Sequence, residues 1–196
     1  MQQENARRTN RQRTEATRAA LLDAARALFV EKGYAETGTP EIVRAASVTR
    51  GALYHHFADK TDLFRAVVTR ESEIVAMEIE SASADADNAH AALMRGAAGW
   101  FDAMNDAGRA RLLLLDGPAV LGRAEMDRID RETSAATLID GLRAGQQAGQ
   151  IADLPLHALA SLLSALFDRA ALDITNGGSR DDYLAVIETL FRSLAR

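Results

Sequence analysis

Apolar residues recur at helical spacing along most of the chain, and short polar or glycine-containing stretches separate the repeats. This pattern predicts one helix from about Thr17 to Lys32, which Gly33 ends, and a longer helix from about Thr61 to Ser81. A short apolar stretch is expected to end at Asp116-Gly117-Pro118. Further helices are expected over residues 90–105, 125–147, 156–174 and 183–194. The chain is therefore predicted to be all-α, with about nine helices.

Residues 39–60 contain two short helical patterns on either side of a turn at Ser47. Thr39 and Pro40 suit the start of the first helix, because a threonine hydroxyl accepts from free N–H groups and proline needs no donor there. Thr49 is expected to cap the second, shorter and more polar helix. In a helix-turn-helix, the first helix braces a second helix that enters the major groove. The segment therefore predicts a DNA-binding element.

Composition places limits on the class of protein. The 196 residues include no cysteine, which excludes disulfides and thiolate metal sites and favours a reducing compartment. No run reaches the roughly 18 apolar residues of a membrane span, and the polar N-terminus has no apolar signal segment. We expect a soluble, cytoplasmic, helical protein without a cofactor or a metal.

The formal net charge of −5 is unevenly distributed along the chain. Residues 1–60 hold 10 basic and 7 acidic side chains, or +3, and the remainder holds 13 basic and 21 acidic ones, or −8. A basic head on an acidic body can still approach phosphate, because salt confines each field to about 8–10 Å. Residues 1–16 lack apolar periodicity and are expected to form a disordered arm, either a solubilising tail or an extra phosphate or minor-groove contact.

Several residues around the two short helices carry a more specific pattern. They are Phe29, Gly33-Tyr34, Thr37-Gly38-Thr39, Ala52-Leu53-Tyr54-His55-His56-Phe57 and Lys60. Over about residues 17–68, this combination resembles the N-terminal domain of the TetR/AcrR family of bacterial transcriptional regulators. Ser47 departs from it, since the family usually has glycine there. If the turn requires a positive φ, serine costs about 1 kcal/mol.

The resemblance implies a DNA-binding surface on the second short helix and around it. Its candidates are Thr39, Arg44, Thr49, Arg50, Gly51, Ala52, Tyr54, His55 and Lys60. Arg50 can pair with guanine or with phosphate, and Lys60 matches the family's phosphate clamp. Leu53 and Phe57 are assigned to the core. Adjacent histidines on a helix diverge by about 100°, so His55-His56 does not predict a metal site.

The family resemblance also implies a cavity for a small molecule in the C-terminal part and a dimer formed by the last two helices. Candidate cavity residues are Trp100, Phe101, Met104, Met126, Ile129 and Phe167. Candidate dimer residues are Leu159, Leu163, Leu166, Tyr183, Val186, Ile187, Leu190, Phe191 and Leu194. His90, Arg123, Asp130 and Asp168 are expected to be surface or salt-bridged groups, or polar contacts in the cavity. Two recognition helices about 34–36 Å apart would read a palindrome.

These inferences predict an N-terminal arm and helix-turn-helix domain over residues 1–68 and an effector-binding and dimerisation domain over 69–196. The expected function is a homodimeric repressor that leaves its DNA operator when an unknown apolar effector binds. A DNA-binding activator or architectural protein without an effector remains an alternative. A helical-bundle enzyme is a further alternative, but the sequence contains no nucleophile elbow, no phosphate loop and no acid/base pair at productive spacing. A purely protein-binding adaptor would need neither the Arg-rich arm nor Tyr54-His55.

Overall fold

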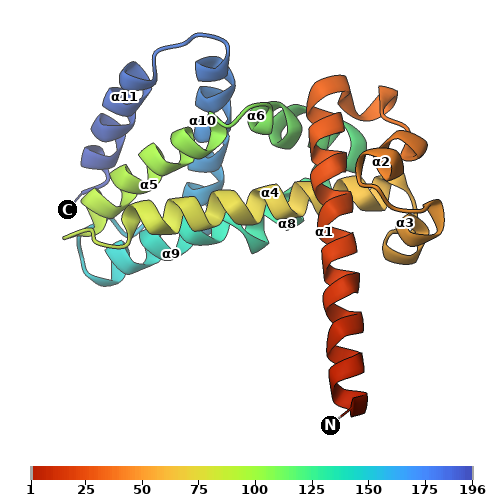
Figure 1. Ribbon diagram of the computed structural model, residues 1–196. Coiled ribbons are helices and arrows are strands. Elements are labelled where there is room, and N and C mark those ends of the chain that lie inside the picture. Colours follow the sequence, from red (N-terminus) through yellow and green to blue (C-terminus); the bar gives the residue numbers. More distant parts are fainter. Residues whose placement is uncertain (1, 196) are drawn as a thin grey trace. The chain divides into compact units, whose positions relative to one another are not determined.

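The computed structural model describes residues 2–195, with side chains from Arg11 to Ala195. These residues form an all-helical chain that divides into two compact units, residues 1–68 and 69–196 (Figure 1). The N-terminal unit contains α1 (Gln2–Glu36), α2 (Thr39–Ala45), α3 (Arg50–His56) and the start of α4 (Lys60–Ser83). The rest of α4 and all later helices belong to the C-terminal unit.

Helix α1 begins earlier than its apolar pattern predicts. The expected start near Thr17 is wrong, because the helix already runs from Gln2, so the arm predicted over residues 1–16 is helical from that residue. Arg11 and Glu15 form an ion pair one turn apart, which supports a helix that has no apolar face there. The arm's earlier side chains lie outside the described residues, and its phosphate contacts stay a prediction. The regular helix is interrupted at Gly33, which has φ of 82° and ψ of 167°.

The N-terminal unit packs α1, α2 and α3 against one another around a small aromatic core. The Phe29 and Phe64 rings meet edge to face with centroids 5.1 Å apart, and the Tyr34 ring lies 5.0 Å from Phe64. The Tyr34 hydroxyl and the Thr61 hydroxyl are hydrogen-bonded at 2.9 Å. These contacts join the end of α1 to the start of α4, because Phe64 and Thr61 lie in the first turns of α4.

The C-terminal unit contains two departures from the predicted helix boundaries. The chain does not stop at Pro118: α6 (Arg109–Arg111), a π-helical turn (Leu112–Asp116) and α7 (Gly117–Leu121) follow one another directly. Proline fits there because it lies in the first turn of α7, where no amide donor is needed. Conversely, the single helix expected over 125–147 is broken at Thr133 into α8 (Arg123–Glu132) and α9 (Ser134–Gln147). The Thr133 hydroxyl donates to the Ile129 carbonyl at 2.8 Å, so it competes for the acceptors that would continue the helix.

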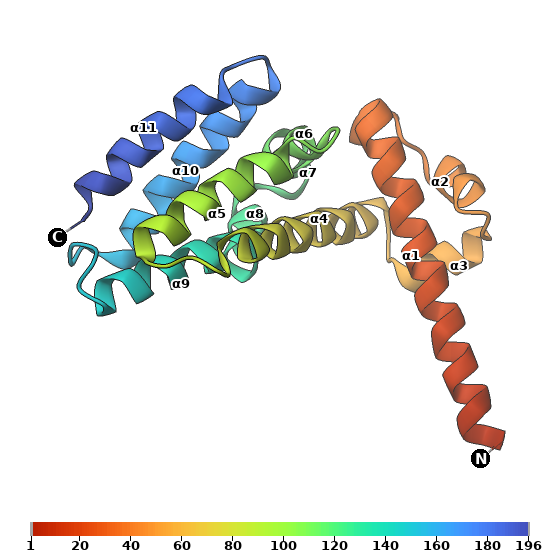
Figure 2. The same ribbon diagram turned by 60° about the vertical axis from the view of Figure 1, so that its left-hand side comes forward.

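The core of the C-terminal unit lies among α5 (Ala89–Met104), α9, α10 (Leu156–Thr175) and α11 (Arg180–Ser193). Figure 2 shows α10 and α11 running in opposite directions beside α5. The centre of the Phe167 ring lies 6.0 Å from that of Phe101 and 6.4 Å from that of Phe191, so these two aromatic contacts connect α10 to α5 and to α11. Among the described residues, none of the helices combines the length and apolarity that crossing a membrane requires.

A buried ion pair fixes α6 to α4 within the C-terminal unit. Arg109 is 6% exposed and Glu71 is 1% exposed, and the Arg109 Nε donates to the Glu71 Oε2 at 3.0 Å. Arg109 also donates through Nη1 to the Ala103 carbonyl at 2.6 Å. Because a buried charge left without its partner is strongly unfavourable, this pair holds the two helices in one register.

The turn between α2 and α3 has the strain predicted for Ser47. The φ of Ser47 is 55°, and no other non-glycine residue of the described chain has a positive φ.

Replacing Ser47→Gly is expected to raise the free energy of unfolding by about 1 kcal/mol, because glycine adopts this conformation without a Cβ penalty. Urea unfolding followed by circular dichroism measures the change. Ala45→Gly is the matched control, because Ala45 is helical and glycine there should destabilise by about 0.5–1 kcal/mol. A destabilised Ser47→Gly variant would contradict the strain.

Candidate nucleic-acid interface and interior cavities

Helix α3 is short, and its position depends on one cap and two buried anchors. The Thr49 hydroxyl accepts from the Ala52 amide at 3.1 Å, which confirms the predicted N-cap. Leu53 is fully buried and Phe57 is 3% exposed, so the core assignment of both is confirmed. A helix of seven residues is not stable alone in water, and these contacts are what hold α3 in place.

The opposite side of α3 is open to solvent. Arg50, Gly51, Tyr54 and His55 are exposed, and Ala52 is half-buried. A Cβ built on Gly51 would meet only the Thr49 hydroxyl, at 3.9 Å. The protein's own packing therefore gives no reason for glycine at this position, whereas close approach of another molecule's surface would.

Two polar side chains, Thr39 and Arg50, are linked to Tyr54 across the turn. Hydrogen bonding by the Thr39 hydroxyl, followed by that of Arg50, lowers the pKa of the Tyr54 phenol. The Arg50 guanidinium also lies 5.5 Å from the centre of the Tyr54 ring. Arg50 and Tyr54 therefore form one exposed polar group on α3, which Thr39 of α2 orients.

Thr39 does not cap α2 as predicted. Gly38 occupies the N-cap position without a side-chain hydrogen bond, and Thr39 is the first helical residue. This leaves its hydroxyl free to act on Tyr54 instead. Arg44, on the same helix, is exposed.

Lys60 has a different environment from the exposed phosphate clamp that the sequence predicts. Its ammonium donates to the Tyr34 carbonyl at 2.9 Å and to the Thr37 carbonyl at 3.1 Å, and it lies 4.1 Å from the centre of the Tyr34 ring. Lys60 is half-buried and closes the end of α1. The structure thus assigns it a stabilising role inside the N-terminal unit. These hydrogen bonds could not be predicted from the sequence, because the carbonyl partners lie more than 20 positions from Lys60.

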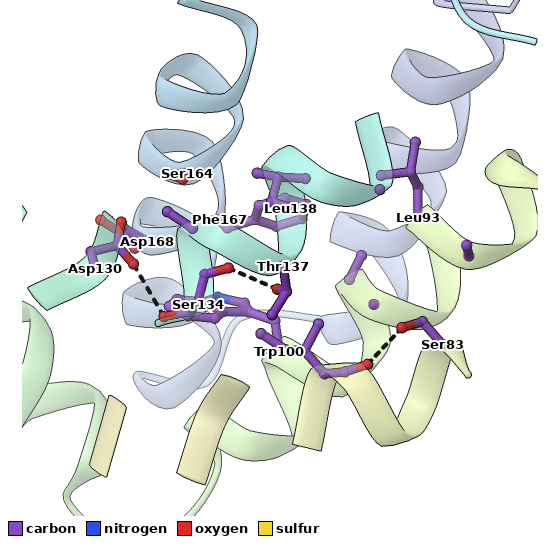
Figure 3. Close-up of a pocket in the computed structure, with 16 residues that line it drawn as sticks. Ser83, Leu93, Trp100, Asp130, Ser134, Thr137, Leu138, Ser164, Phe167 and Asp168 are labelled. Carbon is purple, nitrogen blue, oxygen red and sulfur yellow. Dashed lines mark hydrogen bonds between the residues drawn. The ribbon is translucent and has the colours of Figure 1, made fainter. Parts of the chain in front are cut away.

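The C-terminal unit encloses two adjacent cavities. The apolar cavity has a volume of about 90 Å³ and is lined by Ile79, Leu93, Trp100, Leu138, Phe167 and smaller residues. The acidic cavity has a volume of about 70 Å³ and is lined by Met104, Leu113, Met126, Arg123 and Asp127 among others. Trp100, Asp130, Ser134 and Asp168 belong to the walls of both. Figure 3 shows Asp130 and Asp168 side by side at one end of the apolar cavity, with Leu93 toward the other.

Four of the six predicted cavity residues reach these walls. Trp100 lines both cavities, Phe167 lines the apolar cavity, and Met104 and Met126 line the acidic cavity. Phe101 and Ile129 line neither cavity; they are 2% and 1% exposed and fill the core, so their assignment is corrected. The two aspartates are not surface groups. Burial raises the pKa of Asp130, and burial together with the charge of Asp130 raises the pKa of Asp168 to about 6.

The predicted dimer residues divide into two groups. Leu163, Ile187 and Phe191 are 7%, 1% and 3% exposed, so they pack inside the protomer and cannot form an outer face. Val186 and Leu190 are exposed, whereas Leu159, Leu166, Tyr183 and Leu194 are half-buried. Leu162, which is not among the predicted dimer residues, is 72% exposed. Its signal is the spacing of Leu159, Leu162 and Leu166, a second apolar stripe beside the core stripe of α10.

Comparison with known proteins decides the family. Residues 21–67 match the model for bacterial regulatory proteins of the tetR family, and residues 90–196 match a tetracyclin repressor-like C-terminal domain. The transcriptional repressor Rv1474c of Mycobacterium tuberculosis is 30% identical over 185 residues, which cover 92% of this chain and 94% of the relative. The chain belongs to the TetR family. It is therefore a DNA-binding transcriptional regulator.

Two further TetR-family relatives match very different shares of the chain. The regulator AcrR of Shigella flexneri is 46% identical over 74 residues, but the match covers 37% of this chain and only 34% of the relative. A crystal structure of a TetR-family regulator from Pectobacterium atrosepticum is 31% identical, covers 94% of this chain and 97% of its own, and superposes with a TM-score of 0.75. The all-α class, with an N-terminal helix-turn-helix and a C-terminal helical domain, is confirmed.

Gly51 permits a test that separates DNA contact from folding in this TetR-family protein. Gly51→Leu is expected to weaken DNA binding at least tenfold, because a large side chain would hold α3 away from the groove floor. The same change should raise the free energy of unfolding slightly, since leucine favours a helix over glycine by close to 1 kcal/mol. Fluorescence anisotropy with labelled duplex measures affinity, and thermal unfolding measures stability. Unchanged affinity would contradict the assignment of this face.

Proposed function

We propose that this protein is a homodimeric, effector-responsive repressor that binds an inverted-repeat operator through the exposed side of α3. The observation that carries the proposal is the surface formed by Thr49, Arg50, Gly51, Tyr54 and His55, which has polar donors around a glycine with open space above it. Arginine pairs with guanine edges or phosphates, and hydroxyls and amides at a helix start contact phosphate. Rv1474c, similar over nearly its whole length, is named a repressor, which supports the sign of regulation.

Exposed apolar side chains on the last two helices support the dimer. Leu162, Val186 and Leu190 are 72%, 57% and 38% exposed, although each lies beside a residue that is buried in the core. A second copy of the same surface would cover them, as in an isologous interface. Two copies of α3 would then read two half-sites one helical turn apart.

The walls of the two cavities support an effector response. Ile79 and Ser83 of α4 line the apolar cavity, and Ser72 of the same helix lines the acidic cavity. The first residues of α4, from Lys60 to Val68, belong to the N-terminal unit that carries α3. A ligand that repacks the cavity walls therefore acts on a helix that both units share. Switching operator occupancy from 99:1 to 1:99 requires about 5.5 kcal/mol of preference for one state.

Selection of bound duplexes from a random DNA pool tests the operator directly. The account predicts enrichment of an inverted repeat whose half-site centres lie about 10 base pairs apart, or a multiple of this spacing. Enrichment of single, unpaired sites, or no enrichment over the starting pool, would contradict it.

Charge placed on the exposed apolar residues tests the dimer. The double variant Leu162→Glu with Val186→Glu should sediment as a monomer and lose most operator affinity, because two carboxylates would be buried in each interface. Met77→Glu is the matched control, since Met77 is 59% exposed on α4 and should leave the dimer intact. Analytical ultracentrifugation distinguishes the two forms. A dimeric double variant would show that another surface joins the protomers.

A further inference from the structure

Acidic side chains outnumber basic ones in the walls of both cavities. Among the described residues that line the apolar cavity, the ionisable side chains are Asp130 and Asp168, and there is no lysine, arginine or histidine. The acidic cavity contains the same two aspartates together with Asp127 and Arg123. The space shared by both cavities therefore combines an apolar body with an excess of carboxylates.

The two shared aspartates are half-buried, and neither has a cationic partner in contact. Asp130 accepts hydrogen bonds from the Ser134 hydroxyl, at 3.1 Å, and from the Ala135 backbone amide, and no ion pair to a cation is found for it among the described residues. Asp168 has neither a hydrogen bond nor an ion pair there, and the charge of Arg123 offsets its burial only in part. A half-buried carboxylate without a cation is less stable than an exposed one, and a positively charged ligand would stabilise it.

Trp100 adds an aromatic face at the same place, together with an indole N–H donor that only an acceptor on the ligand could pair. Its indole Nε1 is buried and meets no acceptor in the described chain. Trp100 lines both cavities, and in Figure 3 it lies next to Ser134, with the aspartates close by. An indole face also attracts cations, most strongly where water is excluded.

We infer that the effector is a small organic monocation, with an ammonium or amidinium group held between Asp130 and Asp168 and an aromatic or aliphatic body among Trp100, Phe167 and Leu138. The role of this cation as an effector rests on the proposed function, whereas its binding to the cavity can be tested independently of that function. An anion would meet two carboxylates, and a neutral ligand would leave both unpaired. A cavity of about 150 Å³ holds a benzene-sized molecule, so a ring with a charged arm has to occupy both volumes, of about 90 and 70 Å³, and to widen them.

The single tryptophan of the chain makes the test direct, because Trp100 is the only residue that emits as tryptophan. Three probes with the same ring are titrated against the full chain at pH 7.5: benzyltrimethylammonium, its uncharged isostere neopentylbenzene, and phenylacetate. The cation should change Trp100 emission saturably and bind at least tenfold more tightly than the neutral isostere, and phenylacetate should bind most weakly. Equal affinity for cation and isostere, or no saturable change with the cation, would overturn the inference.

Asp168→Asn separates charge recognition from folding. The variant should lose about tenfold in affinity for benzyltrimethylammonium, because one of the two carboxylate charges that face the cation is removed, and keep its affinity for neopentylbenzene. Its thermal unfolding midpoint without ligand should rise at pH 7.5, because the variant no longer buries an unpaired carboxylate. Asp140→Asn, an exposed carboxylate on α9 outside both cavities, is the matched control and should leave the affinities of all three probes unchanged. Unchanged cation affinity in Asp168→Asn would contradict the inference.

The pH dependence of binding gives an independent readout. Because the pKa of Asp168 is raised to about 6, lowering the pH from 7.5 to 5 protonates it and should weaken cation binding, while the isostere's affinity stays constant. Asp127, Asp130 and Arg123 also act on this group, and Asp168→Asn should reduce the pH effect. A cation affinity that does not fall with pH would count against the inference. A cation that binds as predicted without altering operator affinity would preserve the ligand class and refute the proposed effector response.

Discussion

The N-terminal unit is organised around the need to hold one short helix with its polar side outward. Helix α3 has seven residues, too few to persist alone, so its stability comes from the Thr49 cap and from the buried Leu53 and Phe57. Ser47 gives the turn its left-handed residue, and serine bears strain that glycine would avoid. Leu53 and Phe57 anchor α3, and Gly51 and its polar neighbours stay exposed to solvent.

The C-terminal unit differs in that it holds charged side chains in its interior. Arg109 and Glu71 are buried, paired with each other, and fix α6 to α4, whereas Asp130 and Asp168 are half-buried and have raised pKa values. The ion pair stabilises one arrangement of helices, and the cation that we infer would stabilise the two aspartates. Because α4 forms part of the cavity walls and continues into the N-terminal unit, the proposed effector would act on a helix that both units share.

The local chemistry of the helix-turn-helix could be predicted from the sequence, because caps, turns and apolar periodicity act within a few residues. Thr49, Ser47 and Leu53 all behave as their neighbours in the sequence indicate. Contacts between distant segments could not be predicted in this way. Lys60 binds carbonyls at the end of α1, Leu162 lies outside a core that its neighbour Leu163 enters, and Asp168 is buried by helices that are remote in the chain. The π-helical turn before Pro118 and the break at Thr133 likewise depend on packing that periodicity does not show.

The absence of cysteine makes the central claim, that the exposed side of α3 enters a DNA groove, accessible to site-directed cleavage. His55→Cys places a single thiol on that exposed side, to which an iron chelate that cleaves nearby DNA can be attached. The account predicts cuts in both halves of the bound operator from this position, and none from the same reagent on Asp140→Cys in the C-terminal unit. An operator that is bound but left uncut by the chelate at position 55 would contradict it.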